Sequence, residues 1–533
     1  MSFTASYFPY STTKSFSSIA IDYIEGEDAL KPFYNNTADI EGVKKTIEER
    51  KQFDTDRSLL VKYLNLQYKH IVVDEKLRSN INSLLLPNTF TITTAHQPNI
   101  FTGHLYFIYK ILHAIKLAET LKQQLPENNF VPVYYMGSED ADLEELGEVN
   151  INGIHYRWQT TQTGAVGRMK IDKAFIELID SIHAQLGVQL YGNDIMQKVK
   201  TAYTLDKTIE QATFEFVHEL FSTYGLIILL PDATMLKASF APVMKKELME
   251  AFSHKAVEQT MRTFPQKYKI QAAGREINLF FLEDGYRERI EKNGSIYSLA
   301  DGRRNWNEEA MLQELENNPV AFSPNVILRP VFQEWILPNV AFIGGGGELA
   351  YWLELKKVFA EAKVPYPVLV LRNSFSIVNK KTVEKIASLN MVAADFFQPT
   401  SELLDRLIKK YSEVQLDLSK EKEQLNNLYS QLKILATAAD ATLEKHVIAL
   451  HIAAEKRIAK LEKKMYSAEK KRFEAQQRKI EAIKKSLYPM GNLQERVDNL
   501  LPWYAVYGAT FIDMLYQNSL SLEQQFGLIQ EKA

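Results

Sequence analysis

The strongest constraint on the fold is a long stretch without helix breakers. No glycine or proline occurs between Thr400 and Leu487, and the apolar residues there alternate at spacings of three and four. This spacing predicts amphipathic helices that pack as a coiled coil. We expect an antiparallel hairpin whose first arm has a seam from Leu404 to Leu435 and whose chain reverses at 436–440. Because turns usually contain glycine or proline, one uninterrupted helix is the alternative.

Composition excludes several kinds of chemistry. The chain has 533 residues, enough for two to four domains of roughly 100 to 200 residues each. It contains no cysteine, which excludes a thiolate nucleophile, a Cys-ligated zinc and an iron–sulfur cluster. A net charge of −3 argues against a nucleic-acid partner. The basic run 456–485 is interpreted as a solvated face of the coiled coil, with a binding surface as the alternative.

The N-terminal segment gives no sign of targeting to a membrane. It is polar and lacks a basic stretch followed by an apolar one, and apolar runs such as 226–230 are far shorter than the roughly 20 residues that span a bilayer. We therefore expect a cytoplasmic protein without a membrane partner.

The first half of the chain alternates between strand and helix patterns. Residues 89–95 are rich in β-branched side chains, 105–121 have helical apolar spacing, and 130–136 form a second apolar strand. This order predicts a βαβ unit with neighbouring parallel strands. The continuous apolar runs 226–230 and 368–371 are interpreted as further, central parallel strands. The fold class is therefore α/β, with a parallel-sheet core.

Changes in pattern along the chain suggest domain boundaries. Short β patterns and the turn pairs Asp284-Gly285, Asn293-Gly294 and Asp301-Gly302 indicate a hairpin-rich insertion. The expected order is an N-terminal helical preface (1–86), the first part of the core (87–270), a connecting-peptide insertion (271–320), the second part of the core (321–399), the coiled-coil hairpin (400–487) and a C-terminal helical segment (488–533).

The first candidate site is the loop between the strand at 89–95 and the following helix. It carries His96, Gln97 and His104. Strand ends of this kind bind ligands in α/β folds, and imidazoles next to a helix N-terminus suit a phosphate or carboxylate. Alternatively, His104 only caps the helix and His96 is a satisfied strand-end residue.

The second candidate is an acidic loop after the strand at 130–136. It carries Glu139, Asp140 and Asp142, followed by Glu144 and Glu145. Such a cluster can hold a substrate ammonium group, bind Mg²⁺ or accept a proton. The alternative is an acidic first turn of a helix that complements the helix dipole.

The third candidate combines a glycine run with polar strand ends. Four glycines before a helix allow a ligand to approach the backbone closely, although no Lys-Ser/Thr follows as in a P-loop. An ordinary flexible turn is the alternative. The candidate binding residues in this part of the chain are Asn325, Arg329, Gly344, Gly345, Gly346, Gly347, Glu348, Tyr351, Trp352, Arg372, Asn373 and Ser374.

Several segments together resemble one known family. The segments TTAHQPNIFTGHLYFIYKILHAIKLA, YYMGSEDADLEEL, SPNVILRPVFQEWILPNVAFIGGGGELAYWLELK, PVLVLRNS and GNLQERV are similar, in the same order, to the BshC family of bacillithiol biosynthesis. The resemblance covers almost the whole chain. It implies a Rossmann-like core similar to class I nucleotidylyltransferases, interrupted by connecting peptides, and a coiled coil that forms a homodimer.

The resemblance also implies an activity. It implies a ligase that joins the carboxylate of cysteine to the glucosamine amine of glucosaminyl malate, with ATP as the activating co-substrate. His96 and His104 would stabilise phosphate charge, Glu139, Asp140 or Asp142 would hold an ammonium group, and Arg329 or Arg372 a malyl carboxylate. The glycine run would hold the activated substrate. Neither an HxGH nor a KMSKS motif is present, so the kind of activation stays open.

Two rival functions fit the same features. One is a nucleotidylyltransferase of other specificity. The other is a non-catalytic coiled-coil adaptor whose α/β core senses a ligand.

Overall fold

The computed structural model describes residues 2–272 and 274–532, and the chain folds into two compact units. The first, which we call the core unit, comprises residues 3–376 and 492–529. The second, the coiled-coil unit, is built mainly from residues 377–491. None of the helices in the described part of the chain is both long enough and apolar enough to cross a membrane.

The core unit is organised around a parallel five-stranded sheet. Its strands are β2 (Thr89–His96), β3 (Asn129–Met136), β6 (Ile227–Leu229), β12 (Asn339–Gly344) and β13 (Val368–Leu371). They lie in the spatial order β13-β12-β2-β3-β6, which is the 3-2-1-4-5 order of a Rossmann fold. Helix α5 (Leu105–Gln124) connects β2 to β3, which pair in parallel register from Thr89↔Asn129 to His96↔Met136. The predicted βαβ unit is confirmed.

The interpretation of 226–230 and 368–371 as central strands is wrong. β6 and β13 form the two edges of the sheet, yet both are buried on both faces, which explains their continuous apolar sequence. Tyrosine side chains form hydrogen bonds with the backbone groups on the outer edges of these two strands. The Ile228 N–H donates to the Tyr68 hydroxyl (2.8 Å), and the Tyr23 hydroxyl donates to Leu369 O (2.8 Å). An edge strand that is covered and paired in this way has the composition of a central one.

Helices from the N-terminal segment cover the sheet. They are α1 (Ser18–Ile24), α2 (Ile40–Lys51), α3 (Arg57–Gln67) and α4 (Glu75–Ser83). Apolar residues of α2 and α5 pack with β2, β12 and β13 in one buried cluster. The sequence predicts an N-terminal helical preface (1–86) and a C-terminal helical segment (488–533). However, β1 (Phe3–Phe8), β15 (Phe526–Glu531) and β14 (Ser374–Val378) form a separate three-stranded sheet, so pairing of distant segments replaces helix at both ends.

Two insertions extend the core unit. Between β3 and β6 lie α6 (Leu143–Leu146), the ribbon of β4 (Glu148–Ile151) and β5 (Ile154–Arg157), and helices α7 (Lys173–Leu186), α8 (Gly192–Ala202) and α9 (Ile209–Phe221). After α10 (Thr234–Glu250) and α11 (Phe252–Met261) comes an antiparallel sheet in the order β10-β9-β8-β7-β11. Its strands are β7 (Leu279–Glu283), β8 (Tyr286–Asn293), β9 (Ile296–Leu299), β10 (Asn305–Asn307) and β11 (Phe322–Pro324). The turn pairs noted in the sequence lie between these strands.

The rest of the core unit is helical. Helix α12 (Glu308–Asn317) follows β10, α13 (Arg329–Ile336) precedes β12, and α14 (Gly346–Glu354) with α15 (Lys356–Ala362) connects β12 to β13. Helices α21 (Leu500–Tyr507) and α22 (Thr510–Gln517) come from the C-terminal segment.

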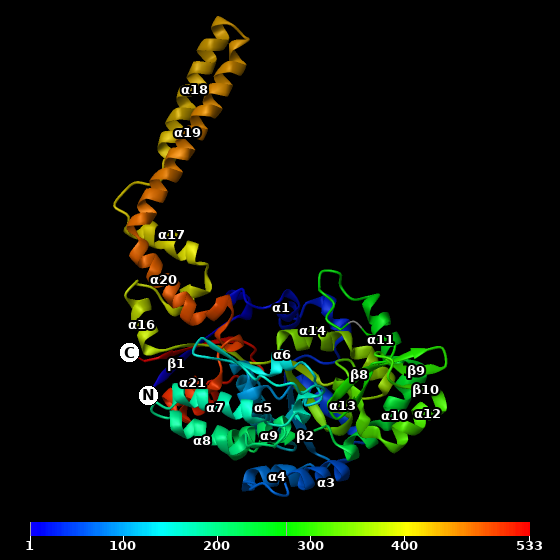
Figure 1. The fold of residues 1–533 in the computed structure, drawn as a ribbon. Helices are drawn as coiled ribbons and strands as arrows, with labels where there is room; N and C mark the ends of the chain where they lie inside the picture. Colours follow the sequence, from blue (N-terminus) through cyan, green and yellow to red (C-terminus); the bar gives the residue numbers. More distant parts are fainter. Residues whose placement is uncertain (1, 273, 533) are drawn as a thin grey trace. The chain divides into compact units, whose positions relative to one another are not determined.

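The coiled-coil unit contains the predicted hairpin, with one difference. Helices α18 (Ser419–Ala439) and α19 (Leu443–Arg472) run side by side in opposite directions (Figure 1), so a single uninterrupted helix is excluded. The expected first-arm seam is broken, because α17 (Thr400–Tyr411) ends before α18 and packs on α20 (Glu474–Leu487). Residues 377–399, which the sequence assigned to the core, belong to this unit because α16 (Lys380–Ala387) also packs on α20.

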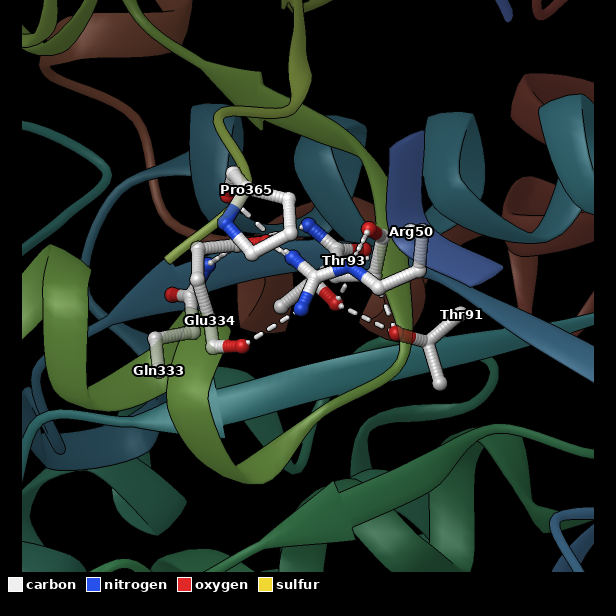
Figure 2. Close-up of polar contacts among 7 residues, drawn as sticks. Arg50, Thr91, Thr93, Gln333, Glu334 and Pro365 are labelled. Carbon is white, nitrogen blue, oxygen red and sulfur yellow. Dashed lines mark hydrogen bonds and ion pairs between the residues drawn. The ribbon is translucent and has the colours of Figure 1, made fainter. Parts of the chain in front are cut away.

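A buried ion pair joins α2 to the sheet. The Arg50 guanidinium donates to the Glu334 carboxylate (2.7 Å) and to Asn339 O (3.0 Å), and both charged side chains are almost fully buried. The Asn339 side chain in turn accepts hydrogen bonds from the hydroxyls of Thr91 (3.2 Å) and Thr93 (2.8 Å). Figure 2 shows this buried polar network. It connects α2, α13, β12 and β2, with every charge partnered as burial requires.

Replacing Arg50 should therefore be strongly destabilising. We expect Arg50→Ala to lower the free energy of unfolding by about 3–5 kcal/mol, because it leaves the buried Glu334 carboxylate without its cation. Urea denaturation measures this. The neighbouring Lys51→Ala, which removes an exposed pair with Glu48, is the control and should change stability little. Equal effects of the two variants would contradict the assigned role.

A second buried polar group lies in α5. His113 accepts a hydrogen bond from the Asn373 N–H at Nδ1 (3.1 Å), and its Nε2 lies 2.6 Å from Ser521 O. These partners require a neutral imidazole with the proton on Nε2. Burial lowers the pKa of His113 to about 4.

This depressed pKa predicts a loss of stability in acid. In the unfolded chain a histidine binds a proton near pH 6.5, whereas folded His113 does not, so stability falls as pH drops from about 6.5 towards 4. We expect His113 to contribute about 2 kcal/mol to the difference in unfolding free energy between pH 7 and pH 5. Denaturation at both pH values should show a smaller difference for His113→Gln. The exposed His70→Gln should behave like the wild type.

Candidate functional site

A cavity of about 660 Å³ lies at the carboxyl edge of the parallel sheet. It is lined by residues at or after the ends of β2, β3, β6, β12 and β13, and by residues of the antiparallel insertion. In a sheet of this strand order, the crossovers on either side of β2 and β12 leave towards opposite faces. The crevice formed there is where open α/β sheets bind ligands. Its volume is typical of a small-molecule site.

The cavity brings together twelve of the predicted site residues. They are His96, Gln97, Glu139, Asp140, Asn325, Arg329, Gly345, Gly346, Gly347, Glu348, Tyr351 and Arg372. The cavity lining does not include His104, Asp142, Gly344, Trp352, Asn373 or Ser374. Segments that are far apart in the sequence, from His96 to Arg372, therefore meet at one sheet edge.

His96 lies at the end of β2 and faces the cavity. It is 8% exposed, and its Nε2 is buried without a hydrogen-bond partner among the described residues. The rings of Tyr106 and Phe107 lie 5.4 and 5.2 Å from the imidazole. Burial, with Lys110 nearby, holds the pKa of His96 well below its usual value. The imidazole is therefore neutral, with a buried nitrogen available to a ligand.

The loop after His96 turns away from the cavity. Phe101 and Thr102 have positive φ angles of 50° and 70°, and the Asn499 side chain donates hydrogen bonds to Phe101 O (2.9 Å) and Gly103 O. His104 follows at the N-cap position of α5, without a side-chain capping bond, and lies outside the cavity. The sequence could not predict this, because the loop is fixed by the C-terminal segment.

Lys110 is a cavity residue that the sequence analysis missed. It lies on α5, is 2% exposed, forms an ion pair with Glu348 and donates to Ala95 O (3.0 Å). Glu348 also accepts from the Gly345 N–H (2.8 Å) at the start of α14. A lysine in the apolar stretch LYFIYKILHAIKLA was the available signal, since a buried ammonium group requires a partner.

The acidic loop is neutralised by the protein's own cations. Lys237 pairs with Glu139 and, at 2.9 Å, with Asp232. Arg168 binds Asp232 with two hydrogen bonds of 2.7 and 2.9 Å. Burial raises the pKa of Glu139, with Lys237 opposing the shift. Glu139, one of the crowded carboxylates noted in the sequence, thus has a protein partner that comes from a distant segment.

The other two acidic candidates differ in their surroundings. Asp140 accepts a hydrogen bond from Gln97 (3.1 Å) and lies 3.9 Å from Arg287, with its side chain 40% exposed. Asp142 caps α6 by accepting from the Glu145 N–H (3.1 Å). Asp142 therefore follows the alternative of an acidic helix start, whereas Asp140 faces the cavity.

Two predicted arginines line the cavity but differ in how many of their hydrogen bonds are made within the protein. Arg329 donates to the Tyr351 hydroxyl (2.7 Å), and its Nη1 is buried without a partner among the described residues. Arg372 is paired with buried Glu495 (2.7 Å) and also donates to the Ser374 hydroxyl (2.9 Å). Arg329 therefore has hydrogen-bonding capacity left for a ligand, while much of the capacity of Arg372 is used within the protein.

The predicted residues outside the cavity have structural contacts. Trp352 stacks on Phe342, with ring centroids 4.2 Å apart, and is fully buried. Asn373 donates its N–H to His113, and Ser374 donates to Glu495 (3.1 Å). Gly344 ends β12 and accepts the Arg372 N–H (2.8 Å). These residues hold the strand ends in place, a role that sequence position alone does not distinguish from ligand contact.

The lining of the cavity carries an excess of positive charge. Seven cationic side chains line it against three carboxylates. The cations are Lys110, Arg275, Arg287, Arg289, Arg329, Arg372 and Arg496, and the carboxylates are Glu139, Asp140 and Glu348. Each carboxylate lies within 4 Å of a protein cation. The cavity is thus suited to a ligand with several negative charges.

Among the described residues, no group of three or more His, Asp or Glu side chains is arranged to hold a metal ion. Of the carboxylates considered for Mg²⁺, Glu139 is paired with Lys237, Asp140 lies 3.9 Å from Arg287, and Asp142 caps α6.

Comparisons with known proteins agree with this architecture. Residues 4–373 match the family model described as "Bacillithiol biosynthesis BshC, N-terminal Rossmann-like domain", and residues 375–531 match its "C-terminal coiled-coil domain". A protein of Flavobacterium johnsoniae is 37% identical over 522 residues, and one of Christiangramia forsetii is 36% identical over 527 residues. Each alignment covers 98% of both chains, and each relative is named "Putative cysteine ligase BshC". The chain therefore belongs to the BshC family.

Proposed function

We propose that this protein joins the carboxylate of cysteine to the amine of glucosaminyl malate, forming the amide bond of bacillithiol. The proposal is supported by membership of the family and by the names of its relatives. The observation that carries it is the cationic cavity at the carboxyl edge of the sheet. A malyl group carries two carboxylates, and guanidinium groups bind carboxylates through paired hydrogen bonds.

Arg329 is the residue proposed to bind a malyl carboxylate. Its Nη1 is buried without a partner among the described residues, and the Tyr351 hydroxyl holds its Nη2. An unpaired buried donor is costly, so an anionic ligand that accepts from it gains affinity. Arg372, which was the other candidate, is already paired with Glu495.

Asp140 is the carboxylate proposed to bind a substrate ammonium group. It lines the cavity and its side chain is 40% exposed. Glu139 is paired with buried Lys237, and Asp142 caps α6, so neither has the same access to a substrate. His96, with its neutral imidazole and buried Nε2, is placed to accept a hydrogen bond from the attacking amine.

A nucleoside triphosphate is the proposed activating co-substrate. Amide formation from a free carboxylate requires one of its oxygens to leave, and ATP supplies that chemistry by making the oxygen part of a phosphate leaving group. The cavity supports this proposal by its volume of about 660 Å³ and its excess of cations. The protein's own part is to hold the carboxylate, the amine and the phosphates together in one crevice.

Product analysis by mass spectrometry tests the proposal. With cysteine, glucosaminyl malate and ATP, we expect bacillithiol together with AMP or ADP, which also distinguishes the two modes of activation. We expect Arg329→Gln to lower kcat/KM by about 10- to 100-fold, mainly through KM for glucosaminyl malate. Arg157→Gln is a matched control, because Arg157 forms an exposed pair with Glu148 outside the cavity.

Other products would favour the rival functions. A nucleotide conjugate without the amide would indicate a nucleotidylyltransferase. Normal bacillithiol production in cells that carry only Arg329→Gln and His96→Ala variants would indicate an adaptor and contradict the ligase.

We also propose that a second copy of the chain packs on the coiled-coil unit. Large apolar side chains of α18 and α19 remain exposed in a single chain, among them Leu428, Ile434, Leu435, Leu450 and Leu461 at 48–70%. A coiled coil with such a surface buries it by association.

Light scattering tests this association. We expect a dimer at micromolar concentration, and a monomer with an unchanged core for the double variant Leu428→Glu and Leu435→Glu. Glu423→Gln, a change at an exposed polar position of α18, is the control. A wild-type monomer at this concentration would contradict the proposal.

A further inference from the structure

We propose that the phosphates of the activating nucleotide bind to three arginines of the antiparallel insertion, Arg275, Arg287 and Arg289, and not to the helix N-termini at the sheet edge. All three line the cavity. The inference rests on the proposed function, which requires a phosphate-bearing co-substrate.

The two helix N-termini at the sheet edge are already occupied. At α14, the Gly345 N–H donates to the Glu348 carboxylate (2.8 Å), which itself pairs with Lys110. A phosphate there would meet the negative charge of Glu348. At α5, the Leu105 N–H donates to Asp498 O (2.8 Å). A phosphate at either of these usual positions would therefore compete with an oxygen of the protein for an N–H.

Arg287 is held in place by neighbouring groups. Its guanidinium carbon lies 3.8 Å from the centroid of the Phe280 ring, and its side chain is 13% exposed. Asp140 lies 3.9 Å away on the cavity side. The Nε of Arg287 is buried without a hydrogen-bond partner among the described residues. Because Asp140 lies beyond hydrogen-bonding distance and Nε is unpaired, the guanidinium has hydrogen-bonding capacity left for an anionic ligand.

Arg289 adds a second cation on the same face of β8. Side chains two residues apart in a strand point to the same side, so Arg287 and Arg289 lie next to each other. Phe280 is the register partner of Arg289 on β7. The Glu288 carboxylate accepts from the Arg289 backbone N–H (2.8 Å), but among the described residues the Arg289 guanidinium has no ion-pair partner, so it can bind an anionic ligand.

Arg275 approaches from the loop before β7, and a buried asparagine fixes this loop. Asn278 accepts from the Arg275 N–H (3.1 Å) and donates to Arg275 O (2.8 Å). It also accepts from the side chain of Asn325 (2.8 Å), another lining residue. Three arginines from two segments of the insertion thus line the cavity, a set that suits a chain of phosphates, each with oxygens for a guanidinium fork.

The division of the cavity follows from these contacts. Arg329, Tyr351 and Asp140 lie at the sheet edge and serve the substrate, while Arg287 and Arg289 lie on the insertion and serve the phosphates. Asp140 lies between the sheet edge and the insertion, because it accepts from Gln97 at the end of β2 and lies 3.9 Å from Arg287 of β8. The insertion is then the part of the chain that determines whether a nucleotide binds.

Calorimetric titration of the full-length protein tests the inference. The probes are ADP, inorganic tripolyphosphate, adenosine and L-malate. For Arg287→Gln and Arg289→Gln we expect the affinity for ADP and tripolyphosphate to fall by about 10- to 100-fold, while that for malate is unchanged. Arg303→Gln is the matched control, because Arg303 lies in the same insertion, is 71% exposed and pairs with Asp301 outside the cavity.

The outcomes separate this inference from the proposed function. Wild-type affinity of both variants for ADP and tripolyphosphate, or a wild-type protein that binds neither probe, overturns the phosphate site. An equal loss of adenosine affinity also overturns it, because the arginines would then not act on the phosphates. If wild-type protein forms no amide but loses ADP affinity in the two variants, the phosphate site stands and the ligase proposal fails. Arg289→Gln keeps the test valid should the contacts of Arg287 be needed for folding.

Discussion

The Arg50–Glu334 ion pair and its hydrogen-bonding partners determine how the two halves of the parallel sheet meet. Asn339, Thr91 and Thr93 join β12 to β2 at their amino ends, and Arg50 ties that junction to α2. This junction lies between the first and the fourth strand of the sheet, where the direction of the crossovers changes. A crevice at the opposite, carboxyl end follows from that topology. Because both charges are buried, the network allows little variation in how the strands meet.

A second set of buried charges shapes the crevice itself. The Lys110–Glu348 pair joins α5 to α14, so the helices on both sides of the junction have fixed positions. The Lys237–Glu139 and Arg168–Asp232 pairs fix the ends of β3 and β6 in the same way. These pairs neutralise the carboxylates of the cavity and leave the arginines as its excess charge. The preference for anionic ligands is therefore a result of how the internal pairs are distributed, and not of the net charge of the chain, which is −3.

Local pattern was enough to predict much of the architecture. The strands at 89–95 and 130–136, the helix between them, the turns of the insertion and the coiled-coil hairpin are each encoded within short windows of sequence. The failures have a common cause. The continuous apolar sequences of β6 and β13 are typical of central strands. Both are edge strands, and they can have this composition because Tyr68 and Tyr23, from distant parts of the chain, pair with their outer backbone groups. The predicted first arm of the coiled coil is too long, because the helical repeat continues through α17, which packs on α20 and is separate from α18.

The sequence by itself determined the α/β class, the hairpin, the exclusion of cysteine chemistry and the polar strand ends that gather at one edge. Only the tertiary structure decided which of those polar residues face a ligand. His96 and Arg329 line the cavity and keep buried nitrogens without partners among the described residues, whereas His104 and Trp352 lie outside the lining and Asp142 caps α6. It also revealed Lys110, Arg287 and Arg289. The physical reason is that secondary structure and strand ends follow from local periodicity, whereas the partner of a buried charge comes from any point in the chain and is set only when the segments pack.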